Sequence, residues 1–483
     1  MSSRSVRGVY TNNEWKDIES NTGISVTNPA TEEAIATVPE ATTGAVNEAV
    51  TAAKAAQYEW AKRPAKERGD FVRDIAAVME DHADELAQLI VDEQGKPLDI
   101  AHGEIEGAVE LAEYMAGWDR RIEGDIVPGD ARNESIHILR RPHGVVAGII
   151  PWNYPLAVFI RKLAPALVTG NTMVAKPSEE TPLATLRLVE LVDEHAPLPE
   201  GVLNMVTGGP DVGHALVTHE TVDMISMTGN TETGKQIMRD AADTMAHVSL
   251  ELGGKAPAIV WKDADIDAAV EDILTARITN TGQVCTCAER IYVHSDVREE
   301  FEERYVAAAE DVTIGDPGEN PDMGPHVNKR ELEKTETAVQ QATEAGAQVL
   351  TGGQRPSDEE FATGYWYEPT VVTDVEQDMD IMQQEVFGPV SPIMEIDSLE
   401  QAIEYANDSR YGLSSYVFTD DYATAMQAAE DLEFGETYIN RTLGESWQGH
   451  HVGWNESGIG GEDGKYGVLE YTQLKTVYHN YDQ

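Results

Sequence analysis

Apolar residues recur at every third or fourth position over residues 43–119, and this period predicts a series of amphipathic helices. Residues 122–141 change to Gly and Pro turns with short alternating segments, which predicts a protruding β ribbon rather than core. Short apolar runs follow, for example at 145–150, 172–175 and 224–227, and each is closed by a turn and followed by a helical pattern. Apolar strands that alternate with helices predict a parallel sheet covered on both faces.

A second series of strands and helices begins near Gly254 and runs to about residue 453. Its first strand, 258–261, is followed by alternating aspartates, which suit the N-terminus of a helix. The tail, 470–481, alternates apolar and polar residues like an edge strand. The pattern therefore predicts an α/β protein with two lobes, a ribbon, and a tail strand that pairs between subunits.

Acidic residues dominate the charge of this 483-residue chain: Asp and Glu number 86, Lys and Arg 35, and the net charge is −51. This excess argues against binding to nucleic acid, which needs a basic face, and against docking on an anionic membrane. The acids are interleaved with apolar residues, and 41% of the chain is hydrophobic, so a folded protein with an acidic coat is expected. Molar salt, where the Debye length is only ~3 Å, tolerates such a coat, and we expect a halophile.

No run approaches about 18 consecutive apolar residues, and the first seven residues lack the apolar stretch of a signal peptide. A cytoplasmic protein without a membrane span is therefore expected. Cys285 and Cys287 are the two cysteines of the chain and lie one residue apart. A disulfide between them is implausible, and no metal site is expected.

The segment GNTETGKQ at 229–236 follows an apolar run and nearly fits a phosphate-binding P-loop. In such a loop the residue after the lysine offers a hydroxyl to magnesium, which Gln236 cannot do. A nucleoside triphosphatase is therefore rejected. A strand-to-helix turn whose N–H groups face the phosphate of another nucleotide remains reasonable.

The segment NTGQVCTC at 280–287 holds a candidate nucleophile. Gly282 and Gln283 just before Cys285 suit a tight turn that exposes a thiol, whereas a buried, inert cysteine is the commoner fate of a lone Cys. A separate segment, ELGG at 251–254, places a carboxylate among apolar residues and glycines, which is unusual for a surface acid. The two segments together favour a reactive cysteine.

Short motifs follow one another in a specific order: PWN at 151–153, KPSE at 176–179, TG at 228–229, LELGG at 250–254, GQVC at 282–285, EVFGP at 385–389 and SGIG at 457–460. In this order they resemble the NAD(P)-dependent aldehyde dehydrogenase superfamily over essentially the whole chain. Within it the likeness is to lactaldehyde (glycolaldehyde) dehydrogenases, through CTCAER at 285–290, FGETYINR at 434–441 and WQG at 447–449. The resemblance implies an α/β fold with a Rossmann-like cofactor domain, an α/β catalytic domain and a small β oligomerisation ribbon.

The resemblance also implies domain boundaries. The NAD-binding domain would comprise 1–123 and 142–253, the catalytic domain 254–453, and the ribbon with its tail 124–141 and 454–483. In the family the ribbon and the tail pair across subunits, and a monomer would leave strand edges open. A homodimer or homotetramer is therefore expected.

The same resemblance assigns the chemistry, an NAD-dependent oxidation of an aldehyde to a carboxylic acid. Cys285, as a thiolate, would attack the aldehyde carbonyl and form a thiohemiacetal. The Asn153 side-chain amide and the Cys285 backbone N–H would stabilise its oxyanion. Loss of hydride to the nicotinamide leaves a thioester, and Glu251 would activate the water that releases the acid.

Cofactor contacts of the family match Trp152, Lys176, Ser178, Glu179, Gly209, Gly213, Thr228, Gly229, Asn230, Leu252, Glu385 and Phe387. Lys176 and Glu179 would hold the adenosine ribose hydroxyls, and the acid at Glu179 would repel a 2′-phosphate, which favours NAD over NADP. Glu385 and Phe387 would fix the nicotinamide ribose and ring. Asn230 departs from the family, which commonly has Ser there, and the glycine loop at 208–213 is not a G-x-G-x-x-G fingerprint.

Substrate contacts of the lactaldehyde dehydrogenases match Arg161, Glu445 and His451, and Thr286 adjoins the nucleophile. Glu445 can accept the proton of a 2-hydroxyl group, while Arg161 and His451 can donate to that hydroxyl or to the product carboxylate. Lactaldehyde or glycolaldehyde from sugar catabolism is therefore the leading substrate. The simpler alternative is that these side chains lie on the surface.

Two other functions stay open at this point. One is a semialdehyde dehydrogenase acting on succinate semialdehyde or 2,5-dioxopentanoate, whose distal carboxylate Arg161 or Arg441 could clamp but Glu445 would repel. The other is an NAD-binding protein that does not catalyse. The joint presence of a nucleophile, a base and an oxyanion donor speaks against that second alternative.

Overall fold

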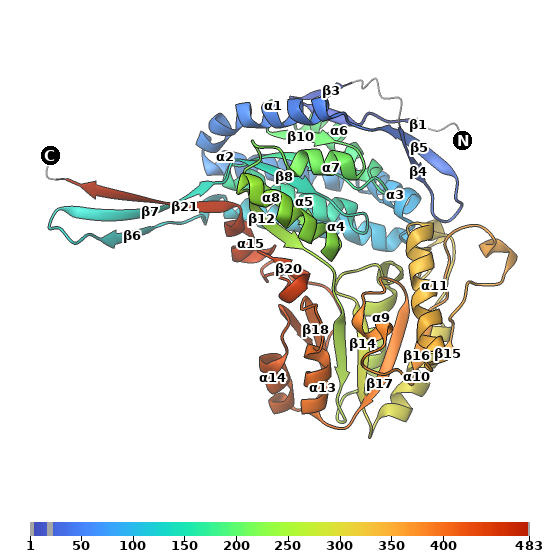
Figure 1. The fold of residues 1–483 in the computed structure, drawn as a ribbon. Coiled ribbons are helices and arrows are strands. Elements are labelled where there is room, and N and C mark those ends of the chain that lie inside the picture. The colour runs from blue at the N-terminus through green and yellow to red at the C-terminus, as the bar shows by residue number, and fades with distance from the viewer. Residues whose placement is uncertain (1–3, 17–22, 482–483) are drawn as a thin grey trace.

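The computed structural model describes residues 4–16 and 23–481. Figure 1 shows two α/β lobes and a narrow ribbon that projects from the first of them. This is the α/β architecture that the sequence predicts. Among the described residues, no helix is both long enough and apolar enough to cross a membrane.

The first lobe is built around a sheet with the strand order β20 (Gly458–Ile459), β12 (His247–Glu251), β11 (Met224–Thr228), β8 (Val145–Ile149), β9 (Thr172–Lys176), β10 (Leu203–Val206), β2 (Val9–Thr11) and β3 (Glu14–Lys16). The strands from β12 to β10 are parallel, and β20, β2 and β3 are antiparallel to their neighbours. A smaller sheet beside it has the order β1 (Arg4–Ser5), β5 (Ala34–Pro39) and β4 (Gly23–Thr27).

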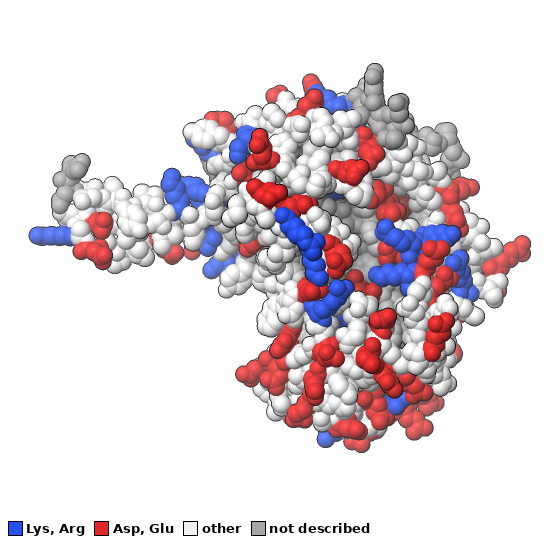
Figure 2. Space-filling model, in the orientation of Figure 1, with Lys and Arg blue, Asp and Glu red and all other residues white. Residues whose placement is uncertain are grey.

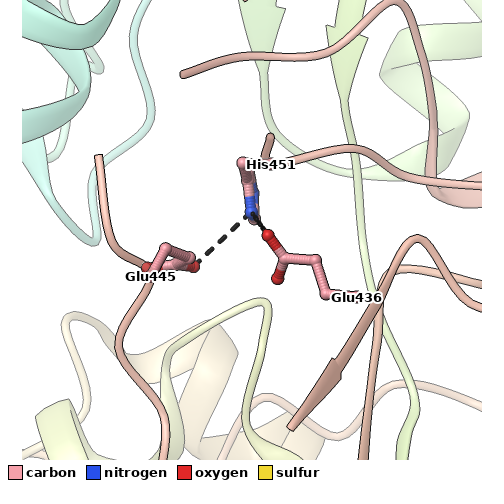
Figure 3. A group of neighbouring side chains, drawn as sticks. All are labelled: Glu436, Glu445 and His451. Carbon is pink, nitrogen blue, oxygen red and sulfur yellow. Dashed lines mark hydrogen bonds and ion pairs between the residues drawn. The ribbon is translucent and has the colours of Figure 1, made fainter. Parts of the chain in front are cut away.

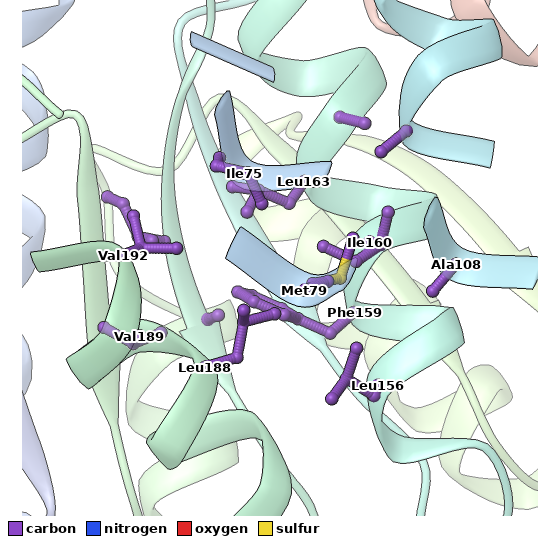
Figure 4. Close-up of a cluster of buried hydrophobic side chains, with 14 of the residues drawn as sticks. Ile75, Met79, Ala108, Leu156, Phe159, Ile160, Leu163, Leu188, Val189 and Val192 are labelled. Atoms are coloured by element: carbon purple, nitrogen blue, oxygen red, sulfur yellow. The ribbon is translucent and has the colours of Figure 1, made fainter. Parts of the chain in front are cut away.

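Helices cover both faces of this sheet: α1 (Thr43–Lys62), α7 (Pro210–Val217) and α8 (Thr231–Thr244) on one, and α2 (Ala65–Asp81), α3 (Ala83–Gln94), α4 (Leu98–Ala116), α5 (Pro155–Thr169), α6 (Leu183–His195) and α15 (Gly464–Glu470) on the other. Strand side chains alternate between the two cores, so Val145 of β8 packs with α1, α7 and α8, whereas Val146 packs with α2, α5 and α6. Figure 4 shows part of the second core, where Met79, Phe159 and Leu188 meet. The helices predicted for 43–119 are α1 to α4.

The second lobe is built around a sheet with the order β15 (Gln348–Thr351), β16 (Thr370–Thr373), β17 (Val390–Ile396), β14 (Ala288–His294), β13 (Ala256–Val260), β18 (Ser414–Phe418) and β19 (Glu436–Ile439). Its strands are parallel except at the β15–β16 edge. Its helices are α9 (Ile266–Ile278), α10 (Arg298–Glu310), α11 (Lys329–Glu344), α12 (Asp380–Gln383), α13 (Leu399–Asn407) and α14 (Tyr422–Asp431). Short 3-10 helices are η1 (Gly117–Arg120), η2 (Thr279–Gly282), η3 (Pro317–Glu319), η4 (Glu359–Phe361) and η5 (Asn455–Ser457).

The projecting ribbon consists of β6 (Asp125–Pro128), β7 (Glu134–Pro142) and β21 (Thr472–Asn480). β21 pairs antiparallel with β7 along its whole length. The tail strand thus has a partner in its own chain along one edge, and the expected pairing between subunits concerns the other edge. In the described chain the outer edges of β6 and β21 stay unpaired, and Ile126, Leu474 and Tyr478 are exposed there.

One crossing between the sheets positions the site. β12 ends at Glu251, and the connection 252–255 leads directly into β13. β14 lies parallel to β13, with Ala288 opposite Ala256, so the loop just before β14 reaches the end of β12. That loop carries Cys285, and the crossing therefore brings the thiol and the carboxylate to one junction between the lobes.

A buried ion pair holds the first lobe against this junction. Lys96 Nζ lies 2.5 Å from Glu104 Oε2, and both side chains are inaccessible to solvent. The other Glu104 oxygen accepts hydrogen bonds from the backbone N–H groups of Leu156 at 2.9 Å and Ala157 at 3.1 Å. Glu104 thus satisfies the first turn of α5, which has no capping side chain of its own.

We expect Glu104→Gln to lower the free energy of unfolding by about 3–5 kcal/mol, because it leaves the Lys96 ammonium buried without a counter-charge. Denaturant titration in molar salt measures the change. The matched control is Glu106→Gln on the exposed face of the same helix, which should cost less than about 0.5 kcal/mol. Equal stability of the two variants would contradict the role given to this pair.

Candidate active site

The loop that carries Cys285 has an unusual backbone. Residues 280–282 are all left-handed, with φ of 51°, 61° and 74°. Such a run costs energy and persists only where the surroundings hold it. At Gly282 a Cβ would lie 2.5 Å from the carbonyl oxygen of Gly388, so the position needs glycine for space as well as for φ. The turn presents Cys285 partly exposed, whereas Cys287 is buried.

Glu251 ends β12 and is almost fully buried, with 2% of its surface exposed. Among the described residues, neither carboxylate oxygen has a hydrogen-bond partner, and His451 Nε2 lies 3.7 Å from Oε2. The connection after β12 approaches the nucleophile closely: a Cβ on Gly254 would lie 2.3 Å from the carbonyl oxygen of Cys285. The connection after Glu251 thus lies close to the Cys285 backbone, and the carboxylate faces His451 without accepting a hydrogen bond.

Asn153, between β8 and α5, reaches the same loop. Its Nδ2 donates to the carbonyl oxygen of Gln283 at 3.0 Å, two residues before Cys285. Its own carbonyl oxygen accepts from Lys96 Nζ at 2.9 Å and from Asn280 Nδ2 at 3.1 Å. Because an amide group carries two N–H bonds, the contact with Gln283 leaves one donor for another acceptor.

His451, Glu436 and Glu445 converge at this junction (Figure 3). His451 Nδ1 lies 3.1 Å from Glu436 Oε1 and 3.5 Å from Glu445 Oε1. Arg161 of α5 is largely buried, and its Nη2 lies 2.9 Å from Asp463 Oδ2. Two lobes therefore contribute charged groups to one small region around the thiol.

Burial and charge shift the pKa values in opposite directions here. Burial raises the pKa of the Cys285 thiol, and His451 lowers it in part. Burial also raises the pKa of Glu251, to about 8, against the effect of His451. Although burial opposes it, Glu436 and the other partners raise the pKa of His451 well above its ordinary value. At neutral pH the imidazole is therefore charged and the Glu251 carboxyl is mostly protonated.

Polar groups at the ends of β9 and β10 form a second cluster. Lys176 Nζ donates to the carbonyl oxygen of Gly208 at 2.7 Å and lies 3.4 Å from Glu179 Oε2. The Gly209 N–H donates to Glu40 Oε1 at 3.1 Å. Burial lowers the pKa of Lys176, and Glu179 and Glu40 oppose that shift. An ammonium between two carboxylates offers donors and acceptors that suit ribose hydroxyls.

Glu385 and Phe387 lie on a loop of the second lobe that meets the first. Glu385 Oε1 accepts from the Gly254 N–H at 2.8 Å. Phe387 has a φ of 57°, and its ring contacts Trp152 edge to face at a centroid distance of 5.4 Å. Its N–H donates to the buried Glu289 at 3.0 Å, which holds the strained residue in place.

Residues that directly follow strands of the first sheet supply the remaining predicted cofactor positions: Ser178 after β9, Thr228 and Gly229 at the end of β11, and Leu252 after β12. Thr228 Oγ1 is buried and has no hydrogen-bond partner in the described part of the chain. Asn230 caps α8, because its Oδ1 accepts from the Thr233 N–H at 2.9 Å. Gly213 lies in α7, where a Cβ would touch Lys176.

Of the four predicted substrate residues, three lie together near the thiol, and the fourth, Thr286, has a structural contact. The structure brings Arg161, Glu445 and His451 together at the thiol, and they are not scattered surface groups. Thr286 is buried, and its carbonyl oxygen accepts from the Tyr416 hydroxyl at 2.5 Å. That contact ties the backbone beside the nucleophile to the core of the second lobe.

Sequence reasoning missed several charged residues that shape the site. Glu289 lies 2.6 Å from Lys255 Nζ and 3.0 Å from Arg277 Nη1, and Glu436 contacts His451. Glu289 and Glu436 stand inside motifs already quoted, CTCAER and FGETYINR, and an acid within an apolar strand signals a buried ion pair. Glu40 carried no such signal, because nothing local links it to β9.

The parallel sheet with polar groups at its strand ends, facing a second lobe that carries a thiol, defines a nucleotide-dependent dehydrogenase. The chain matches the model of the Aldehyde dehydrogenase family over residues 15–477, and it belongs to that family. The family resemblance and the fold class inferred from the sequence are thereby confirmed.

Individual relatives cover nearly the whole chain. A lactaldehyde dehydrogenase of Escherichia coli is 45% identical over 97% of this chain and 98% of its own. A crystal structure of that lactaldehyde dehydrogenase superposes with a TM-score of 0.96 at 44% identity, covering 98% of this chain and 99% of the other. A 3,6-anhydro-alpha-L-galactose dehydrogenase of a Vibrio species is 45% identical over 98% of this chain and 99% of its own.

More distant relatives differ in substrate and cofactor. A D-glyceraldehyde dehydrogenase (NADP(+)) of Picrophilus torridus is 41% identical over 98% of this chain and 96% of its own. A mitochondrial succinate-semialdehyde dehydrogenase of Arabidopsis thaliana is 40% identical over 96% of this chain and 87% of its own. The protein is thus an aldehyde dehydrogenase, and the non-catalytic alternative falls.

The pKa of Glu251 yields a pH prediction. A general base acts only when ionised, and a carboxyl with a pKa of about 8 is roughly 10% ionised at pH 7 and 90% at pH 9. Where hydrolysis of the thioester limits turnover, kcat should therefore rise up to about ninefold over this range. Steady-state rates between pH 6.5 and 9.5 measure the profile.

Glu251→Gln keeps the shape of the side chain but removes the ionisable carboxyl group. It should lower kcat by about 10²- to 10⁴-fold and flatten the profile. A variant that turns over like the wild type, or a wild-type midpoint near the ordinary pKa of a glutamate, would contradict the assignment of Glu251 as base.

Proposed function

We propose that this aldehyde dehydrogenase uses Cys285 as nucleophile, Asn153 as oxyanion donor and Glu251 as general base, with NAD as cofactor and a small 2-hydroxyaldehyde as substrate. The observation that carries the proposal is the convergence of Glu445, His451 and Arg161 on the thiol, because these groups match a hydroxyl next to the reacting carbonyl. Lactaldehyde and glycolaldehyde are the leading candidates.

Cys285 attacks the aldehyde carbon, and the carbonyl oxygen becomes an oxyanion. The Asn153 amide and the Cys285 backbone N–H donate to this oxygen, where the charge develops. The cofactor, when bound, accepts the hydride that leaves the thiohemiacetal carbon. Glu251 then takes a proton from water as the water attacks the thioester carbon, and the thiolate of Cys285 leaves.

The residues at the strand ends fit a dinucleotide. Thr228 Oγ1 is an unpaired buried hydroxyl, and Lys176 presents an ammonium beside Glu179 at the end of β9. Gly213 packs beside the stem of Lys176, where a Cβ would lie 3.5 Å from Lys176 Cε. Lys176 and Glu179 would hold the adenosine ribose, and Glu385 the nicotinamide ribose.

Two carboxylates support NAD over NADP. Glu179 lies 3.4 Å from Lys176, and Glu40 contacts the Gly209 N–H at the start of α7. A 2′-phosphate beside either acid would meet like charge, which costs several kcal/mol when the groups are poorly solvated. The sequence motif pointed to Glu179 alone, and Glu40 is a second acid that disfavours a 2′-phosphate.

We expect wild-type enzyme to prefer NAD, and Glu179→Gln to lower the ratio of kcat/KM for NAD to that for NADP by about tenfold or more, with a smaller effect for Glu40→Gln. Initial rates with both cofactors at one aldehyde concentration measure the ratio. Glu48→Gln on the exposed face of α1 is the control and should leave it unchanged. A wild-type preference for NADP would refute the assignment.

The charges around the thiol support a 2-hydroxyaldehyde over a semialdehyde. Arg161 is already paired with Asp463 at 2.9 Å, so its charge is partly neutralised for a distal carboxylate. Glu445 and Glu436 lie beside His451 and would repel such a group. Lactaldehyde, D-glyceraldehyde and 3,6-anhydro-α-L-galactose, named for similar proteins, all carry a hydroxyl next to the aldehyde carbon.

The substrate is tested by kcat/KM for L-lactaldehyde, glycolaldehyde, succinate semialdehyde and 2,5-dioxopentanoate. We expect the hydroxyaldehydes to lead, and Glu445→Gln to lower their kcat/KM by about tenfold through the lost charge-assisted hydrogen bond. Glu433→Gln, an exposed acid of the same region, is the control. A preference for succinate semialdehyde or 2,5-dioxopentanoate would contradict the assignment of a 2-hydroxyaldehyde as substrate.

The acidic coat and the ribbon support two further parts of the proposal. Figure 2 shows acidic side chains over both lobes, with basic ones gathered mainly near the waist between them. We infer a protein adapted to high salt, where such repulsion is screened. The open edges and exposed apolar residues of the ribbon support a homodimer or homotetramer.

A further inference from the structure

The imidazole of His451 stands between two chemically different groups. On one side its Nδ1 lies 3.1 Å from Glu436 Oε1 and, farther away, 3.5 Å from Glu445 Oε1. On the other side its Nε2 lies 3.7 Å from Glu251 Oε2, and the same ring interacts with the Cys285 thiol. A ring in this position can do more than bind a substrate hydroxyl, because it also faces the nucleophile.

Both partners of this contact are held rigidly. Glu436 begins β19, and its second oxygen accepts from the Tyr438 hydroxyl at 2.8 Å. The backbone of His451 exchanges two hydrogen bonds with Glu462, at 2.9 Å and 2.7 Å. His451 is 2% exposed, so the ring has little access to solvent. The geometry therefore turns Nδ1 toward Glu436 and leaves Nε2 on the side of Glu251.

We propose that Glu436 is a positioning residue that orients His451 toward Cys285, so that His451 takes the thiol proton and pairs with the thiolate. This inference rests on the proposed role of Cys285 as nucleophile. Because a carboxylate only accepts hydrogen bonds, the ring nitrogen facing Glu436 carries a proton and leaves Nε2 as the acceptor.

The proton balance is simple. The Sγ–H bond of Cys285 breaks and an Nε2–H bond of His451 forms, while the Nδ1–H stays toward Glu436. A neutral pair thus becomes a thiolate and an imidazolium. The charged ring that its neighbours favour at neutral pH is the product of this transfer, and the fixed negative charge of Glu436 stabilises it. No other reactant is needed, so the thiol can be activated before substrate binds.

Charged and titratable groups from every neighbouring segment act on His451: Glu251 from β12, Cys285 from the loop before β14, Glu436 from β19, Glu445 from the following loop, Glu462 and Asp463 from the turn before α15, and Arg161 of α5 through its carboxylate partners. Carboxylates outnumber cations in this set. They favour the charged ring, and Glu436, at the shortest distance, contributes most to that effect.

Alkylation of the free enzyme tests the proposal without substrate or cofactor. The rate of Cys285 modification by iodoacetamide is followed from pH 6 to 10 in molar salt, in full-length wild type and in Glu436→Gln. Glu433→Gln is the matched control, since it removes an exposed acid three residues away in the chain. Cys285→Ala reports any labelling of Cys287.

We expect the apparent pKa of alkylation to rise by about one unit in Glu436→Gln, and the rate at pH 7 to fall about tenfold, because the thiolate fraction falls by that factor. The control should match wild type. Turnover of propanal, which has no 2-hydroxyl, should fall by a similar factor in Glu436→Gln, since the defect lies in the nucleophile.

Identical alkylation profiles for Glu436→Gln and wild type would overturn the proposal, and so would a loss seen with lactaldehyde but not with propanal, the mark of substrate binding alone. In both cases aldehyde oxidation by Cys285 would stand. Full activity of Cys285→Ala would instead overturn the proposed nucleophile. If Glu436→Gln does not fold by circular dichroism, His451→Gln against His450→Gln decides the same question by the same profile.

Discussion

The active site depends on one buried carboxylate, that of Glu289. Its oxygens lie 2.6 Å from Lys255 and 3.0 Å from Arg277, and accept from the N–H groups of Val386 and Phe387. Although burial opposes it, these cations lower its pKa to about 2. A charge taken out of water must be fully paired, so the segments around it can take only one arrangement. Those segments are the ones that lead to Glu251, to the Cys285 loop and to the loop carrying Glu385.

The same rule, that buried charges come in pairs, recurs in both lobes. Glu104 pairs with Lys96 and caps α5, and Lys96 in turn holds the backbone of Asn153. Lys162 lies 2.5 Å from Glu462, whose backbone positions His451. Structural ion pairs thus surround the site, whereas the carboxylates of Glu251 and Asp463 have no hydrogen-bond partner in the described part of the chain. Without a hydrogen bond to offset burial, the pKa of Glu251 rises to about 8, near the pH at which the proposed general base would act.

Much of the fold was predictable from local pattern. The period of apolar residues identified α1 to α4, and apolar runs closed by turns identified the parallel strands, because burial imposes those periods directly. The tail strand was predicted as a strand but not with its partner. β21 pairs with β7 across more than 300 positions of sequence, and no local signal encodes a pairing of that separation.

The sequence by itself determined the candidate chemistry: a cysteine in a glycine turn, an acid followed by two glycines, and ordered motifs that name the family. Tertiary structure decided which charged groups act together. Glu40, Glu289 and Glu436 look like ordinary acids among 86, and only the packing of distant segments puts them beside Lys176, Lys255 and His451. The physical reason is the distance over which each acts. A sequence motif specifies the local backbone over a few residues, whereas the pKa of a buried group depends on every charge that the fold brings near it.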